Sequence, residues 1–418
     1  MRIKLVFIFI IFFSGISVPQ VPGHWITRTP MPTPRQEIPH ALINGKIYVP
    51  GGIVNNSGIP TNSVEVYDPS TDSWSEISPM PEALHHHTAV ELNGKLYIIG
   101  GYNAQLFSSQ TDKVQEYDPQ TGIWTEKQSL PYPIASHTSA ALDGMIYLFG
   151  GRNGNTLLNN SLVYDPQTNN WNVLTNMPYL SEHLACAVLD TFVCVFAGRN
   201  FTQNFKKFFI YYPMQDEWIE MPDMPTARSG LAAATLNGRV YVFGGEIPGV
   251  YEENEEFNFI TNQWRQVRSM PTPRHGIGAV TVGDTIYIIG GARVQGFDQS
   301  NVNEGYVNSF ITSTEYESSV PDKFNLSQNY PNPFNPTTKI KFTILSAGTY
   351  RNTPVKLIIY DVLGNEIATL VNEEKPPGVY EVIFNVKDLI NQFPTSGIYF
   401  YQLRTSFLIQ TKKMILLK

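Results

Sequence analysis

Short segments that alternate apolar and polar residues run along most of the chain, and tight turns separate them. In residues 230–243, a stretch of small and apolar residues ends at Asn237-Gly238, and a second apolar stretch follows at once. Asn-Gly supplies the positive φ angles that a two-residue hairpin turn needs, and the same turn recurs at Asn44-Gly45. Alternation of period two without a helical period predicts antiparallel β-strands.

The predicted hairpins recur with one long period. Six tryptophans follow one another at intervals of about 46–50 residues, and paired glycines keep the same phase. An aromatic-acid-proline turn such as Tyr67-Asp68-Pro69 lies before most of the tryptophans. A repeat of this length with four strands, named a to d in chain order, indicates the blade of a β-propeller. The tryptophans are Trp25, Trp74, Trp124, Trp171, Trp218 and Trp264.

The glycine pairs, tyrosines and tryptophans at these spacings resemble Kelch repeats. The resemblance covers about residues 24–320 and implies an all-β, six-bladed propeller in which these residues are structural. After the aromatic residue of the last unit, Tyr316, the chain has Lys323 where a tryptophan is expected, whereas Trp25 stands alone at the start. We therefore expect the N-terminal stretch to supply the outer strand of the last blade, which closes the ring.

The pattern changes at residue 321. An Asn- and Pro-rich opening at 324–336 leads into alternating segments, and these predict a small Ig-like β-sandwich over residues 321–418. The opening, with the terminal lysines, resembles the type A C-terminal sorting domain of the type IX secretion system. That resemblance implies the type IX secretion machinery as a partner and a final location outside the cell or on its outer surface. An adhesive Ig-like module is the alternative.

Residues 1–22 are predicted to be a signal peptide. Arg2 and Lys4 precede an apolar run from Leu5 to Phe13 that is too short to span a bilayer, and small residues follow it. The chain is thus divided into a signal peptide (1–22), a propeller (23–320) and a sorting domain (321–418). We expect passage through the periplasm and no transmembrane segment.

Charge and cysteine content limit the kinds of partner and the kinds of fold that the chain can have. A net charge of −7 argues against nucleic acid, whose phosphates require a basic surface. The only two cysteines, Cys186 and Cys194, exclude a disulfide framework. We expect both to be free thiols, because a turn at residues 190–191 places Ala187 opposite Cys194. A monomer is expected.

Arginines gather in the d–a and b–c connections, which share one face of the propeller. Guanidinium groups suit carboxylate, sulfate and phosphate groups, so this face is predicted to bind an anionic ligand, either an acidic glycan or an acidic peptide. The alternative is that these arginines brace neighbouring loops. The predicted ligand-binding residues are Arg35, Arg228, Arg274, Arg152, Arg199, Arg293, His87, His137 and Glu246.

Histidines precede or open strand a of several blades, among them His85, His86, His87, His183 and His275. Side chains alternate along a strand, so His85 and His87 do not face inward together with His86. We therefore expect neither a metal site nor a cofactor.

We make a separate prediction for each of two further loops on the same face. The acidic run at residues 252–256 is expected to be a solvated loop. The long b–c loop from Ala292 to about Ser313, which contains Phe297, Asp298 and Tyr306, is the best candidate for a lid or a ligand wall.

The sequence favours a non-enzymatic extracellular binding module. A carbohydrate-active enzyme is the first alternative, because Gly245-Glu246 followed by Pro248-Gly249 resembles the active site of the sialic acid mutarotases, which are six-bladed Kelch proteins. Val250 and the residues after it stand where that family has an arginine. A scaffold for protein–protein interaction is the second alternative.

Overall fold

The computed structural model describes residues 23–107, 109–308, 325–344, 353–375, 378–388, 395–405 and 409–417. These residues are built from strands, with one 3-10 turn at Val386–Asp388. The predicted signal peptide (1–22), Tyr316, and the predicted boundary at residues 320 and 321 lie outside the described residues. No described segment forms a helix of the length and apolar character that a bilayer crossing requires.

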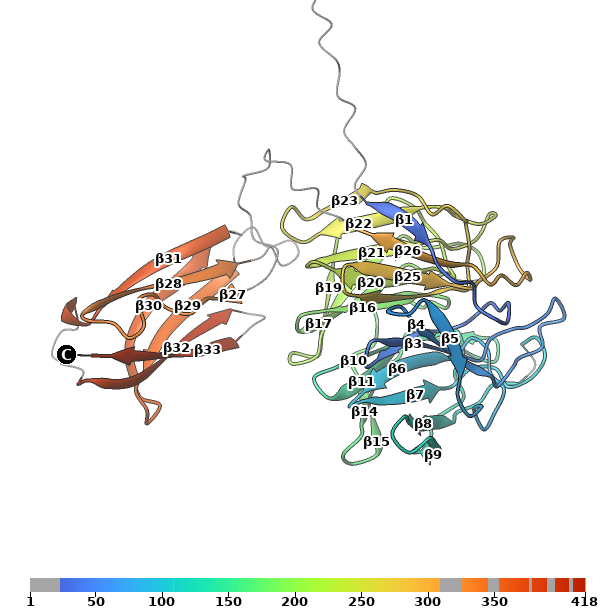
Figure 1. Cartoon of the computed structure of the whole chain (residues 1–418), viewed down its shortest axis with the longest axis horizontal. Helices are drawn as coiled ribbons and strands as arrows, with labels where there is room; N and C mark the ends of the chain where they lie inside the picture. Colours follow the sequence, from blue (N-terminus) through green and yellow to red (C-terminus); the bar gives the residue numbers. More distant parts are fainter. Residues whose placement is uncertain are drawn as a thin grey trace, which may run out of the picture.

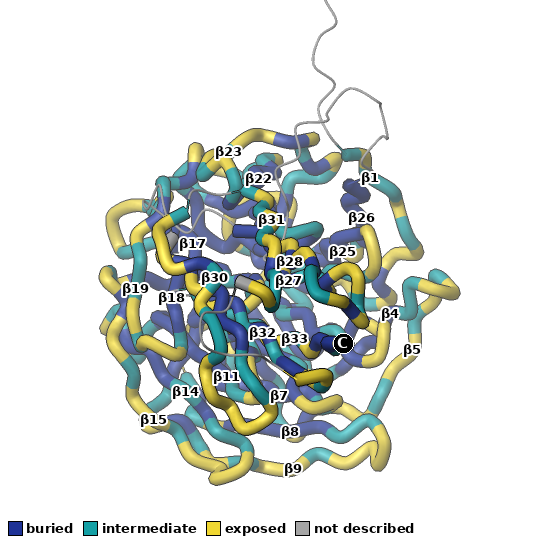
Figure 2. The backbone as a smooth tube through the Cα atoms, turned by 90° about the vertical axis from the view of Figure 1, so that its left-hand side faces the viewer, coloured by how far each residue is buried: buried dark blue, intermediate teal, exposed yellow. Residues whose placement is uncertain are grey.

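Residues 24–307 form six antiparallel four-stranded blades (Figure 1). Strand a of each blade contacts strand a of its two neighbours, so the innermost strands close a ring. These inner strands are buried, and the outer turns are exposed (Figure 2). The predicted all-β, six-bladed propeller is confirmed.

The strands of the first three blades have the following bounds. Blade 1 contains β2 (Ala41–Ile43), β3 (Lys46–Pro50), β4 (Val64–Asp68) and β5 (Ser73–Glu76). Blade 2 contains β6 (Thr88–Leu92), β7 (Lys95–Ile99), β8 (Val114–Asp118) and β9 (Ile123–Lys127). Blade 3 contains β10 (Thr138–Leu142), β11 (Met145–Phe149), β14 (Ser161–Asp165) and β15 (Asn170–Leu174), with a loop hairpin of β12 (Arg152–Asn153) and β13 (Thr156–Leu157).

The remaining blades repeat the arrangement. Blade 4 contains β16 (Ala185–Leu189), β17 (Phe192–Phe196), β18 (Phe208–Tyr212) and β19 (Glu217–Glu220). Blade 5 contains β20 (Ala232–Leu236), β21 (Arg239–Phe243), β22 (Asn254–Asn258) and β23 (Gln263–Gln266). Blade 6 contains β24 (Gly278–Val282), β25 (Thr285–Ile289) and β26 (Asn303–Val307), and its outer strand is β1 (His24–Thr27).

The N-terminal strand closes the ring as predicted. β1 pairs with β26, and Trp25 lies opposite Tyr306. The aromatic partner in the last blade is therefore Tyr306, and the sequence-based choice of Tyr316 is wrong. In every blade the tryptophan indole donates a hydrogen bond of 2.8–3.1 Å to a carbonyl of the preceding blade. These bonds explain why the tryptophans recur with the blade period.

The paired glycines allow each blade to approach the next. Gly51 has a φ of 60°, and a Cβ there would lie 2.6 Å from the carbonyl oxygen of Leu84 in the following blade. A side chain at this position would push the two blades apart. The predicted structural role of the glycines is thus confirmed.

The two cysteines lie in blade 4. Ala187 pairs with Cys194 across the ladder, and both cysteines are free thiols, as predicted.

The C-terminal residues form two antiparallel sheets. One contains β27 (Asn325–Leu326), β28 (Thr337–Ile344) and β31 (Gly378–Asn385), and the other contains β29 (Thr353–Tyr360), β30 (Glu366–Lys375), β32 (Gly397–Thr405) and β33 (Ile409–Leu416). Apolar residues of both sheets, such as Phe342, Leu357 and Met414, form one buried cluster. The sandwich was expected, whereas its strands β30 and β33 were not; its Ig-like character stays a prediction.

Candidate functional site

A ring of six residues surrounds the channel just before strand a of each blade. Their φ angles lie between 52° and 64°, in the left-handed region. Main-chain hydrogen bonds of 2.8–3.0 Å join most neighbours in the ring. A non-glycine residue in this region costs about 1–3 kcal/mol, and such residues cluster at functional sites. The ring consists of Glu37, His86, Ser136, His183, Gly230 and Gly276.

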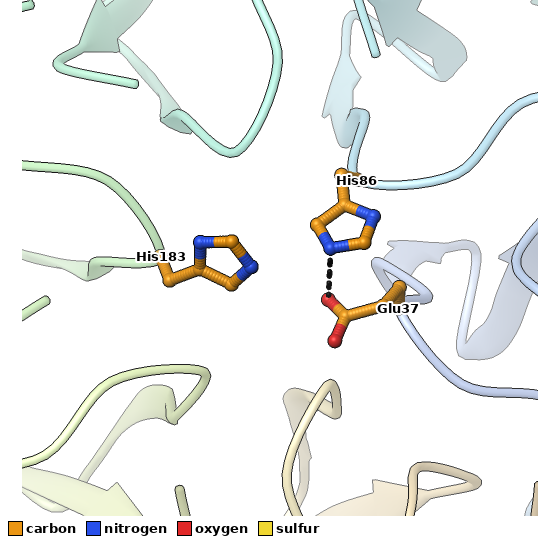
Figure 3. A group of neighbouring side chains, drawn as sticks. All are labelled: Glu37, His86 and His183. Carbon is orange, nitrogen blue, oxygen red and sulfur yellow. Dashed lines mark ion pairs between the residues drawn. The ribbon is translucent and has the colours of Figure 1, made fainter. Parts of the chain in front are cut away.

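Glu37 lies among histidines at this ring, beside a cavity of about 170 Å³. Its Oε2 is 3.4 Å from Nε2 of His86 (Figure 3), and its Oε1 is 3.6 Å from Nδ1 of His275. Burial raises the pKa of Glu37, but the surrounding histidines together outweigh burial and hold this pKa well below its ordinary value. Glu37 is therefore a carboxylate at neutral pH.

Arg199 joins two more carboxylates at the same end of the channel. Its Nη1 donates to Oε1 of Glu246 at 2.6 Å, and its Nε donates to Oε1 of Glu182 at 3.2 Å. Arg152 reaches the other oxygen of Glu182 at 3.4 Å. The side chains of both arginines remain 18% exposed. Glu246 also lies 3.5 Å from Nε2 of His275, which connects this network to Glu37.

Two pKa shifts define the charges of the network. Burial raises the pKa of Glu182, but His183, Arg199 and Arg152 outweigh it and hold the pKa well below its ordinary value. Burial lowers the pKa of His275, but the carboxylates of Glu37 and Glu246 outweigh burial and raise it. The channel mouth can thus donate hydrogen bonds from guanidinium groups, accept them at carboxylates, and hold a proton on His275.

Three of the predicted arginines do not belong to this site. Arg35, Arg228 and Arg274 have no exposed surface. Each guanidinium folds back between strands of its own blade and forms an ion pair of 2.7 Å, with Glu65, Glu255 and Glu304 respectively. Each also donates to main-chain carbonyls of its own blade. The prediction that these three contact a ligand is wrong, because their side chains are buried and their Nη donors bond inside the blade.

The other predicted residues divide into two groups. His87 and His137 are buried where the remaining blades have leucine or isoleucine, at Ile38, Leu184, Leu231 and Ile277. Burial lowers the pKa of each to about 3, so both are neutral packing residues. Arg293 is exposed and pairs with Asp298 of its own loop at 2.9 Å. Of the predicted set, the structure brings Arg152, Arg199 and Glu246 together.

Both loop predictions need correction. Tyr306 lies in β26 and is buried, so the b–c loop of blade 6 ends before Asn303. Part of the acidic run is also a strand, β22, in which Glu255 pairs with Arg228 and Glu256 pairs with Arg239 and Arg265. Glu255 and Glu256 are therefore buried ion-pair partners.

Sequence reasoning missed Glu37 and Glu182, and it left His86, His183 and His275 unassigned. The prediction considered whether neighbouring histidines of one strand could face the same point, which the alternation of side chains along a strand prevents. In the structure, Glu and His side chains of different blades converge instead, because equivalent positions of the blades meet at the channel. An alignment of the six repeats with one another would have placed these residues at two adjacent positions.

Exposed apolar side chains surround the channel mouth. Phe107 packs against His86 with ring centroids 5.5 Å apart, and the guanidinium of Arg152 lies 5.7 Å from the ring centroid of Phe201. Phe201 is 62% exposed. Such a polar centre with an apolar rim is typical of small-ligand sites. The rim residues, all in b–c or d–a connections, are Ile59, Leu106, Phe107, Leu180, Phe201 and Val294.

Two family models match the chain. The KLHDC2/KLHL20/DRC7 Kelch-repeats domain matches residues 37–245 and 86–291. The secretion system C-terminal sorting domain matches residues 328–417. This second match indicates export by the type IX system to the cell surface or the extracellular space.

Similar curated proteins match short parts of this chain. The Kelch-like protein terF of Aspergillus terreus is 39% identical over 92 residues, which are 20% of this chain and 20% of that protein. N-acetylneuraminate epimerase of Shigella flexneri is 39% identical over 79 residues, 18% of this chain and 22% of that protein. The chain thus spans about a fifth of the length of these curated relatives.

A solved structure shares the fold. The structure of YjhT superposes with a TM-score of 0.59 at 16% identity and covers 66% of this chain and 95% of that one.

Proposed function

The chain belongs to the Kelch-repeat family, and we propose that its propeller is an exported binding module that takes an anionic glycan at the mouth of its channel. The observation that carries this proposal is the network of Glu182, Arg199 and Glu246. Its arginine side chain remains 18% exposed beside the two buried carboxylates, whereas three other arginines are sealed inside blades. A sugar acid presents both groups that this network suits, a carboxylate and hydroxyls.

Arg152 is the residue best placed to take the carboxylate. Its Nε donates to the carbonyl of Gly154 and its Nη2 to the side chain of Asn155, both of them exposed contacts within its own hairpin. A ligand carboxylate can replace these bonds and gain a bidentate contact. The carboxylates of Glu182 and Glu246 can then accept hydrogen bonds from sugar hydroxyls, and Phe201 offers an apolar face to the ring.

Removal of the Arg152 side chain is expected to weaken the binding of a sugar acid about 10- to 100-fold, because a hydrogen bond to a charged group contributes about 1.5–3 kcal/mol. We would titrate the full chain by calorimetry with N-acetylneuraminate, galacturonate and a sulfated sugar, with galactose as the neutral counterpart. Arg152→Ala and Arg199→Lys are the test variants. Arg293→Ala is the matched control, because it removes an exposed arginine from the same face without touching Glu182 or Glu246.

The outcomes separate the alternatives. Binding of the acids that falls in Arg152→Ala and persists in Arg293→Ala supports the proposal. Binding of galactose alone, or equal affinity in all variants, contradicts it. Binding only of a glutamate-rich peptide replaces the glycan with an acidic protein partner, and no binding at all favours a scaffold for protein interactions.

A sugar mutarotase is the second candidate, favoured by the position of Arg199. The sequence lacks the arginine expected after Pro248-Gly249, but Arg199 of the preceding blade contacts Glu246 in space. His275, with its raised pKa, stands 3.5 Å from the same carboxylate. The similarity to N-acetylneuraminate epimerase covers 18% of this chain.

If the chain is a mutarotase, it is expected to accelerate the interconversion of N-acetylneuraminate anomers, as followed by NMR. Glu246→Gln is then expected to lower this rate about 100-fold, because general acid–base catalysis contributes about that factor or more. A wild-type rate equal to that of buffer excludes this candidate.

A further inference from the structure

The side chains of Glu37, His86 and His183 come from three different blades and converge at the channel ring (Figure 3). One ligand-type atom from each residue lies within 4.8 Å of those of the other two. The side chains are 11%, 4% and 5% exposed respectively. Gly276 leaves room for this arrangement, since a Cβ there would lie 2.6 Å from Oε1 of Glu37.

The hydrogen bonds of His85 determine which nitrogen of His86 is free. Nε2 of His85 lies 3.2 Å from the carbonyl oxygen of Ala104, which only accepts, so this nitrogen carries the proton. Nδ1 of the neutral His85 is then an acceptor, and it lies 2.5 Å from Nδ1 of His86, which must donate. The lone pair of His86 is therefore on Nε2, and it faces the Glu37 carboxylate at 3.4 Å. Two acceptors face each other here, an arrangement that a cation between them stabilises.

His183 is oriented in the same way. Its Nε2 lies 3.3 Å from Nη2 of Arg199, a group that only donates, so Nε2 carries a lone pair and Nδ1 carries the proton. Nδ1 faces Oε1 of Glu182 at 3.6 Å and has no hydrogen-bond partner within the described residues. A carboxylate behind the protonated nitrogen of a histidine is the usual support of a metal ligand.

From these contacts we propose that Glu37, His86 and His183 form a site for a divalent transition metal ion, with Zn²⁺ as the best fit. Two imidazoles and one carboxylate suit Zn²⁺, Co²⁺, Mn²⁺ or Fe²⁺ and do not suit Ca²⁺ or Mg²⁺. Three protein ligands leave coordination positions open toward the cavity. Arg199 gives up its contact with His183 on metal binding, while its bonds to Glu182 and Glu246 hold it in place.

The surrounding charges favour a cation. Glu182 and Glu246 are matched by Arg152 and Arg199, so Glu37 remains as the carboxylate available to the ion, shared with His275. The inference goes beyond the proposed glycan binding and needs no sugar ligand.

The test is titration of the full chain, freed of metal with a chelator and of any affinity tag, with Co²⁺. The expected result is one equivalent of Co²⁺ that develops visible d–d absorption and is displaced by Zn²⁺. Loss of a residue that only holds a metal ligand in place weakens metal binding about 10- to 100-fold. Glu37→Gln and His183→Asn remove a ligand itself and are expected to weaken binding at least about 100-fold. His87→Leu, which removes the neighbour of His86 and inserts the residue type found in other blades, is expected to leave the affinity unchanged.

Thermal unfolding in metal-free buffer checks that each variant folds. If Glu37→Gln or His183→Asn unfolds, Glu182→Gln replaces it, with an expected loss of about 10- to 100-fold in affinity. Absence of d–d absorption in the wild-type chain overturns the proposal. Binding that is equally strong in the ligand variants, or that falls as much in His87→Leu, also overturns it.

Discussion

Replacing Glu255 with leucine is expected to lower the free energy of unfolding of the propeller by about 3–5 kcal/mol at neutral pH, because it leaves a buried guanidinium without a counter-charge. Nη2 of Arg228 is 2.7 Å from Oε2 of Glu255, and the two side chains are 0% and 2% exposed. The main-chain carbonyls of Gly244 and Glu253 remain as acceptors for Arg228 but carry no charge to balance it. Urea unfolding followed by circular dichroism measures the loss.

The chain contains its own control for this experiment. Ile134 and Leu162 of blade 3 occupy the positions that Arg228 and Glu255 occupy in blade 5. The main-chain carbonyls of Ile134 and Arg228 accept hydrogen bonds from Gly101 and Gly198, which hold the same position in the preceding blades. Leu162 and Glu255 are each the second residue of strand c. Arg228→Ile combined with Glu255→Leu is therefore expected to recover most of the loss, since an apolar pair often replaces a buried ion pair without cost. If the double variant is as unstable as the single one, the uncompensated charge is not the cause.

The fold could be predicted from the sequence because its determinants recur at fixed spacing. In blades 1 to 5 each tryptophan lies opposite an aromatic residue of strand c, as with Tyr67 and Trp74, and the two are separated by one short turn. Local pairs of this kind leave a period in the sequence. The unpaired Trp25 then identified the closing strand, and only its partner was placed wrongly, at Tyr316 instead of Tyr306.

The role of the buried arginines could not be predicted from their loop positions, because their partners lie in another strand. Every blade with an arginine at this position has a glutamate as the second residue of strand c, as with Arg35 and Glu65. The blade with Ile134 has Leu162 there instead. Comparison of the repeats with one another shows this covariation, whereas the residue type alone suggested an anion site.

The channel cluster was missed for a different reason. Glu37, His86 and His183 are separated in the sequence by one or more whole blades. They meet only because the ring closes, which places equivalent positions around one axis. Their left-handed φ angles, shared with Gly230 and Gly276, are the structural sign of this equivalence.

Acidification from pH 7 to pH 5 is expected to destabilise the propeller, because His40 and His137 are buried as neutral rings. Burial lowers the pKa of each to about 3; the positive charge of Arg35 adds to the effect at His40. The unfolded chain, with an ordinary histidine pKa of about 6.5, binds protons that the folded state does not bind between the two values. Each of these histidines therefore makes its full contribution to the free energy of unfolding above about pH 6.5. The contribution is lost as the pH falls toward 3, by roughly 2 kcal/mol per histidine at pH 5.

His275, whose pKa is raised, contributes with the opposite pH dependence. Its contribution to the free energy of unfolding is complete below about pH 6.5 and is lost as the pH rises through the pKa of the folded state.

His137→Leu isolates one of these contributions, since blades 4 and 5 have Leu184 and Leu231 at the same position. The variant leaves the hydroxyl of Thr88 without its 3.0 Å contact to His137, but that cost is the same at both pH values. Urea unfolding at pH 7 and at pH 5 measures the loss in free energy of unfolding for each protein. This loss is expected to be smaller in the variant than in the wild type by roughly 2 kcal/mol. An equal loss in the two proteins means that His137 has the same pKa in the folded and unfolded states, and it leaves His40 and the other titratable groups as the source of the acid sensitivity.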